Sequence, residues 1–148
     1  MLFLLAGATA LAADAPSFAS WTPENAKQIG KELAAKLNPD GSASQSLANM
    51  GNYSFLMVLR QKTGAAEVHE TMADIMFVES GEATLETGGT LVNGKTTALH
   101  EIRGTAIEGG TQRPIKPGDV LTIPPGTPHW VKVAPGKEVL YLTVKVVH

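Results

Sequence analysis

The sequence predicts one all-β domain of the sandwich or barrel type, preceded by a short helix. The chain has 148 residues, the length of a single domain, and its 15 glycines and 9 prolines favour a fold with many tight turns. From Glu67 onward, apolar and polar residues alternate with a period close to two, which is typical of strands with one buried face. Before residue 40, by contrast, apolar residues recur at the spacing of a helix.

Composition narrows the classes of partner and site. Lys and Arg number 12 against 14 Asp and Glu, a net charge of −2, so no basic surface is available to bind nucleic acid or an anionic membrane. The chain has no cysteine, which excludes disulfides and thiolate metal ligands. Histidines and carboxylates are therefore the strong metal ligands that remain.

Residues 1–13 are predicted to be a signal peptide. Met1–Ala12 is apolar and ends in small residues that suit a cleavage site, but it is too short to span a bilayer. The basic residues that normally begin such a signal are missing, and an apolar strand or helix of the domain is the alternative. We expect a periplasmic or secreted protein that has no membrane association after processing.

Residues 14–52 are predicted to hold the helix and a polar link. Thr22 suits the N-cap, Pro23 the first helical position and Glu24 the first turn. One apolar stripe at helical spacing follows, formed by Ala26, Ile29, Leu33 and Leu37. Asn38–Gly41 should end the helix, and Ser42–Asn52 is interpreted as the link.

The barrel domain is predicted over residues 53–148. Its expected strands are an apolar run at 53–60, alternating segments from 67 to 87, and segments at 120–123, 129–133 and 138–147. Residues 88–117 are less periodic and richer in Gly and Thr, so we expect one or two weak strands and a long loop there.

Polar side chains on inward faces indicate a metal site. His129 shares its face with two valines, Asp74 shares its face with Met76 and Val78, and His69 lies between Glu67 and Thr71 at alternate positions. Each group is costly to bury alone, whereas a divalent cation would satisfy all of them. The alternative is a network without metal, in which each His bonds a backbone carbonyl or one acid.

Two motifs resemble those of the cupin superfamily. Gly118–His129 matches the second cupin motif, G(X)5PXG(X)2H, at every fixed position, and Glu67, His69, Asp74 and Gly81 resemble the first. In the preferred register Glu67 replaces the first motif His, whereas the other register begins at His69 and replaces the second His with Thr71. The Asn that ends the second motif is Val133 here.

The resemblance implies a jelly-roll β-barrel with a metal near its centre. The implied ligands are Glu67, His69, Asp74 and His129, and the metal is one divalent transition ion, Fe, Mn, Zn or Ni. The chain is also similar to small, single-domain, exported bacterial cupins. This similarity implies a fold and a metal site, but it does not indicate a substrate.

Several residues outside the motifs have less specific interpretations. Arg103 and Arg113 are candidates for holding a substrate carboxylate, although a solvated loop position is the simpler interpretation, as it is for Glu101 and Glu108. Trp130 should point away from the interior, under a helix or into a subunit contact. His100 and His148 should be exposed, and a homodimer is expected because the edges of such sheets must be covered.

Two functions follow from these residues. The first is a metal-dependent enzyme of oxygenase, isomerase or decarboxylase type that acts on a small oxygenated organic acid or a sugar-like substrate. The second is a non-catalytic module that binds a small ligand such as a sugar acid.

Overall fold

The computed structural model describes residues 18–148, and its first element is the predicted helix, α1 (Pro23–Ala34). Thr22 caps the helix: its Oγ1 accepts a hydrogen bond from the Asn25 amide at 3.2 Å, and Oδ1 of Asn25 accepts one from the Thr22 amide at 3.1 Å. The signal peptide predicted at residues 1–13 lies outside the described residues. Within 18–148, no helix is long and apolar enough to cross a membrane.

The described chain after α1 forms thirteen strands. They are β1 (Ser42–Asn49), β2 (Tyr53–Arg60), β3 (Ala66–His69), β4 (Met72–Gly81), β5 (Ala83–Thr87), β6 (Thr90–Val92), β7 (Lys95–Ala98), β8 (Glu101–Gly104), β9 (Ala106–Glu108), β10 (Thr111–Ile115), β11 (Val120–Ile123), β12 (His129–Lys132) and β13 (Val139–Val147).

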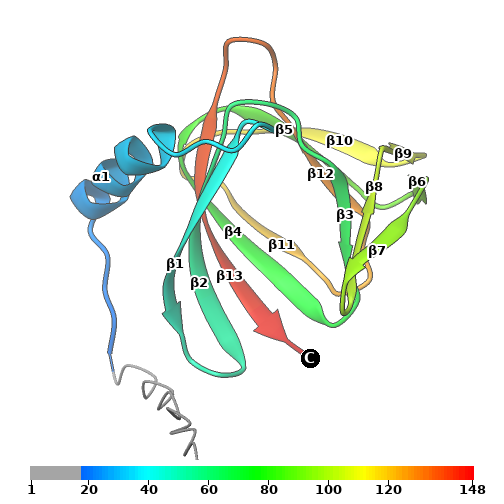
Figure 1. Ribbon diagram of the computed structural model, residues 1–148, viewed down its shortest axis with the longest axis horizontal. Coiled ribbons are helices and arrows are strands. Elements are labelled where there is room, and N and C mark those ends of the chain that lie inside the picture. Colours follow the sequence, from blue (N-terminus) through cyan, green and yellow to red (C-terminus); the bar gives the residue numbers. More distant parts are fainter. Residues whose placement is uncertain (1–17) are drawn as a thin grey trace, which may run out of the picture.

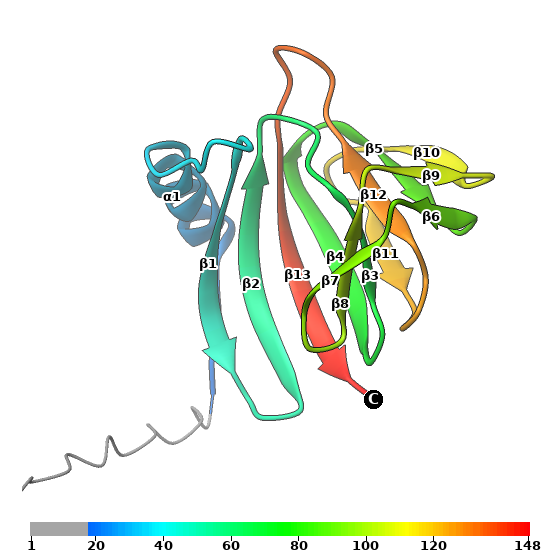
Figure 2. The same cartoon turned by 45° about the vertical axis from the view of Figure 1, so that its right-hand side comes forward.

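Two antiparallel sheets face each other and enclose the core (Figures 1 and 2). The first sheet has the order β1-β2-β13-β4-β11, and the second has the order β10-β5-β12-β3-β8-β7, with β6 and β9 paired beside it. Buried side chains such as Met76, Val131 and Val139 pack between the sheets. The all-β fold with one short helix is as predicted.

Helix α1 lies on the outer face of the first sheet (Figure 1). Its Ala26 and Leu33 pack against Met57, Leu59 and Leu140 from the sheet. The face of β13 that carries Leu140 and Leu142 is therefore an outer face, and the opposite face, with Val139 and Tyr141, looks into the molecule.

Two segments differ from the sequence-based expectation. The predicted link at 42–52 is wrong for Ser42–Asn49, which is the edge strand β1; its buried residues, Ala43 and Ala48, are too small to produce a clear apolar pattern. The long loop predicted within 88–117 is wrong as well, because the segment holds β6 to β10. These strands are only three to five residues long and mostly exposed, so apolar alternation is weak in them.

Two motif glycines place the strands that carry the polar cluster. Gly81 ends β4 at a φ of +76°, and a Cβ there would collide with the carbonyl oxygen of Glu138. Gly126 has a φ of +73°, and its amide donates to the carbonyl oxygen of His69 at 2.8 Å. This bond fastens the loop before β12 to the end of β3, and so brings His69 and His129 together.

Candidate metal centre

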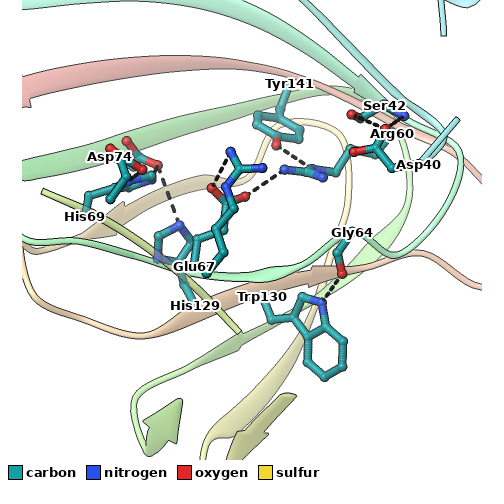
Figure 3. A network of polar contacts seen from close by, with 12 residues as sticks. Asp40, Ser42, Arg60, Gly64, Glu67, His69, Asp74, His129, Trp130 and Tyr141 are labelled. Atoms are coloured by element: carbon teal, nitrogen blue, oxygen red, sulfur yellow. Dashed lines mark hydrogen bonds and ion pairs between the residues drawn. The ribbon is translucent and has the colours of Figure 1, made fainter. Parts of the chain in front are cut away.

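His69, Asp74 and His129 meet between the two sheets (Figure 3). They come from the end of β3, from β4 and from the start of β12, and all three are buried. Oδ2 of Asp74 lies 3.3 Å from Nε2 of His69 and 3.8 Å from Nε2 of His129, and the ring centroids are 5.0 Å apart. One ligand atom from each residue falls within 4.8 Å of the others.

Hydrogen bonds assign the tautomer of both imidazoles. Nδ1–H of His69 donates to Oε2 of Glu101 at 2.6 Å, and Nδ1–H of His129 donates to the carbonyl oxygen of Thr127 at 3.1 Å. Since both acceptors can only accept, the Nδ1 atoms carry the protons, and the neutral rings keep their lone pairs on the Nε2 atoms that face Asp74. Metal-binding histidines are oriented in this way, so the donor set fits a divalent transition metal.

Lys145 from β13 completes the cluster, and sequence reasoning missed it. Its Nζ lies 2.9 Å from Oδ1 of Asp74 and 3.0 Å from Nε2 of His69. Lys145 is directly opposite Asp74 in the pairing of β13 with β4, which explains the contact. Its ammonium balances the buried carboxylate.

The electrostatics of Asp74 and His129 favour the protonation states that a metal requires, whereas the pKa of His69 is raised, because its contacts with Asp74 and Glu101 outweigh the effect of burial. Burial raises the pKa of Asp74, but the contact with His69 and the charge of Lys145 outweigh it and lower the pKa to about 2. Burial also lowers the pKa of His129, because the charged ring loses its hydration. An ionised carboxylate and a neutral imidazole are the forms that coordinate metals.

Glu67, the fourth predicted ligand, is not part of this three-residue group. Its Oε1 accepts a hydrogen bond from Nη2 of Arg60 at 3.0 Å, and its Oε2 lies 3.7 Å from Nη2 of Arg103. It belongs instead to a second group with His69 and Glu101. Thr71, the ligand in the alternative register, lies in the turn between β3 and β4 and does not line the cavity beside the cluster.

The two predicted substrate-binding arginines have different positions. Arg103 lies on β8, opposite Glu67, and lines the central cavity. Arg113 is exposed on β10, at an edge of the second sheet, and does not line that cavity, which agrees with the simpler interpretation of a solvated side chain. Glu101 was predicted to be a solvated loop residue, and this is wrong, because it lies on β8 and is a partner of His69.

The cluster forms one end of a cavity of about 350 Å³ between the sheets. Farther along the wall, Nε of Arg60 donates to the hydroxyl of Tyr141 at 3.1 Å. Thr143, between Tyr141 and Lys145 on β13, has a fully buried hydroxyl without a hydrogen-bond partner among the described residues. The cavity therefore presents a row of polar groups that leads away from the imidazoles.

The remaining sequence expectations concern residues away from the cavity. Trp130 does point outward, but it does not lie under the helix: its Nε1–H donates to the carbonyl oxygen of Gly64 at 2.7 Å. His100 and His148 are exposed as predicted, and His100 pairs with Glu70 at 3.3 Å.

Comparison with solved structures identifies the fold as that of cupin-like proteins. The TT1209 protein of Thermus thermophilus is 19% identical over 79% of this chain and 92% of its own, with a TM-score of 0.56. A cupin-like protein of Thermotoga maritima is 19% identical over 71% of this chain and 68% of its own, with a TM-score of 0.51. No protein-family profile and no curated protein matches the sequence.

An oxalate oxidase has the same fold. It is 19% identical over 74% of this chain and 53% of its own, with a TM-score of 0.53. Glycolate, a substrate analogue, is bound in another structure of an oxalate oxidase. The predicted cupin-type fold is confirmed by these similarities.

Proposed function

We propose that the protein is a metal-dependent enzyme that converts a small oxygenated organic acid, and that His69, Asp74 and His129 hold its metal. The observation that carries the proposal is the orientation of the two imidazoles, each of which has Nδ1 beside a hydrogen-bond acceptor and Nε2 directed at Asp74. Fe, Mn, Zn and Ni all suit this set of two nitrogens and one carboxylate.

A metal with three protein ligands has coordination positions left for a substrate oxygen, which it would polarise as a Lewis acid. The chain's own residues have supporting roles. Glu101 and the carbonyl of Thr127 hold the rings in place, and the cavity beside them has room for a small ligand. The polar groups of β13 are positioned to bind the rest of the substrate.

The charges of the cavity wall favour the binding of an anionic substrate. Its wall holds three cationic side chains, Arg60, Arg103 and Lys145, and three carboxylates, Asp40, Glu67 and Asp74. The wall is therefore neutral when the histidines are neutral, and a divalent cation makes it positive. The small volume and the glycolate bound by an oxalate oxidase of this fold also favour a small acid.

The second candidate is a module that binds a sugar acid or similar ligand without converting it. The contacts of Lys145 favour it, because an ammonium already satisfies Asp74 and His69 without any metal. In this proposal the cavity and its arginines bind the ligand as they would bind a substrate, and no bond of the ligand is broken.

Turnover distinguishes the two. The protein is loaded separately with Fe(II), Mn(II), Zn(II) or Ni(II), and oxygen uptake and product mass are measured with a panel of small hydroxy, keto and phenolic acids. The enzyme proposal predicts turnover with one metal that His129→Ala abolishes and that His100→Ala, at an exposed histidine, leaves unchanged. Binding of an acid without product under every metal would establish the module.

We also propose that the protein is exported and that it forms a homodimer through the edge strand β11. Val120 of β11 and Phe77 of β4 are paired on the outer face of the first sheet, where 62% and 36% of their surfaces are exposed. Light scattering at micromolar concentration should give twice the monomer mass. The mass of the protein from its native host should show cleavage near Ala12, and an intact Met1 would contradict export.

A further inference from the structure

Lys145 binds the same two side chains that would bind the metal. Its Nζ is 2.9 Å from Oδ1 of Asp74 and 3.0 Å from Nε2 of His69. We propose that Lys145 and the divalent cation compete for these groups, so that metal binding displaces the ammonium from the site. This proposal rests on the proposed metal centre and adds to it the exchange of the Lys145 ammonium for the metal.

The competition follows from the single lone pair that the ring of His69 has available. The Nδ1–H bond of His69 to Glu101 leaves one lone pair on the ring, at Nε2. That lone pair accepts from Lys145 or coordinates a metal at about 2.0–2.1 Å, but it does not do both. An ammonium within hydrogen-bond distance of the ligands would also repel a divalent cation at close range.

A second pocket next to the cluster could hold the displaced ammonium of Lys145. Lys145 lines the central cavity and also a second, outer pocket of about 520 Å³ beside β7 and β8, and its side chain is 21% exposed. The carboxylates of Glu67 and Glu101 line the same outer pocket. Arg103 lines this pocket too and lies 3.7 Å from Glu67, so a rotation of the flexible side chain would bring the ammonium toward the carboxylate of Glu101 while the backbone of β13 stays in place.

Lys145 is on this account a positioning residue with two states. Without metal, its ammonium holds His69 and Asp74 in the arrangement that the metal needs. With metal, it lies at the boundary of the two pockets, where it can meet the carboxylate of an anionic ligand. The metal then binds more weakly than its three ligands alone would allow, because the hydrogen bonds of Lys145 must be broken first.

Metal titration by calorimetry, with Zn(II) and Mn(II) as probes, tests the competition. Lys145→Met keeps the length of the side chain and removes the charge, so the affinity should rise by about tenfold or more, the worth of charge-assisted hydrogen bonds that no longer have to be broken. Lys132→Met is the matched control, because Lys132 forms a 3.1 Å ion pair with the buried Glu86 away from the site. Its affinity should equal that of the wild type.

Each outcome of the titration has a separate meaning. Equal or weaker binding by Lys145→Met would overturn the competition and leave the metal centre intact. Absence of binding by both the wild type and Lys145→Met would overturn the metal centre and the competition with it. If only Lys145→Met binds metal, both the metal centre and the competition are supported. In that case Lys145 binds His69 and Asp74 more strongly than the metal does.

Acetylation of the wild-type protein gives a second readout that needs no variant. Acetic anhydride labelling followed by peptide mass spectrometry is compared with and without Zn(II). Zn(II) should speed the labelling of Lys145 and leave that of Lys132 unchanged. Unchanged or slower labelling of Lys145 in the zinc-bound protein would contradict the displacement.

Discussion

The carboxylate of Glu101 accepts a 2.6 Å hydrogen bond from Nδ1–H of His69, and this contact decides which nitrogen of the ring faces Asp74. The two residues are directly opposite each other in the pairing of β3 with β8. Cross-strand register, and not proximity in sequence, therefore sets the orientation of the ring that we propose as a metal ligand.

Removal of this carboxylate should weaken metal binding. In Glu101→Ala the ring of His69 loses its orientation and part of its basicity, so metal affinity should fall by about 10- to 100-fold. Calorimetric titration with Zn(II) measures the change. The control is Glu70→Ala, because Glu70 makes a similar contact to His100 on the surface. Equal affinities of the two variants would contradict the role of Glu101.

Glu67→Gln should leave metal affinity little changed. The carboxylate of Glu67 is engaged by Arg60 and Arg103 and lies outside the group formed by Asp74 and the two imidazoles. Asp74→Asn, by contrast, removes a ligand and should lower the affinity by about tenfold or more. A large loss in Glu67→Gln and none in Asp74→Asn would restore Glu67 as the acidic ligand.

The stability of the metal-free protein should decrease at acid pH through Asp74. The pKa of Asp74 is lowered from 3.8 to about 2 in the folded state, so its contribution is complete above pH 4 and is lost as the pH falls toward 2. The contribution is on the order of 2 kcal/mol. Urea unfolding in the presence of chelator, at pH 5 and at pH 2.5, should show a smaller decrease for Asp74→Asn than for the wild type. Equal decreases would show that Asp74 has an ordinary pKa.

Thr143→Val should not destabilise the protein. The buried hydroxyl of Thr143 has no hydrogen-bond partner among residues 18–148, so its replacement removes a desolvation cost of about 1–3 kcal/mol and loses no bond. Thr63→Val is the control: the hydroxyl of Thr63 accepts from the amide of Val133 at 2.9 Å, and its loss should cost about 1 kcal/mol. Urea unfolding measures both. A destabilised Thr143→Val would show that the hydroxyl is bonded in solution.

Much of the fold could be predicted from local sequence. Thr22 and Pro23 mark the start of the helix, and the two-residue period marks the long strands, because both signals depend on neighbours along the chain. β1 was missed because an edge strand of small polar residues buries too little apolar surface to show the period.

The candidate site could be predicted in part. His69, Asp74 and His129 lie in motifs of fixed spacing, so their convergence was foreseeable. Glu101 and Lys145 reach the cluster through the pairing of β8 with β3 and of β13 with β4, and neither pairing is encoded in local spacing. For Lys145 a signal was present, since Tyr141, Thr143 and Lys145 alternate with the apolar outer face of β13.

X-ray absorption spectroscopy of the metal-loaded protein tests the central claim most directly. The wild type should bind one equivalent of metal and show two imidazole nitrogens at about 2.0–2.1 Å, and His129→Ala should show one, with a lower metal content. His100→Ala should match the wild type, because the side chain of His100 is exposed and is not part of the cluster. A metal content and an imidazole count that His129→Ala leaves unchanged would contradict a metal centre formed by His69, Asp74 and His129.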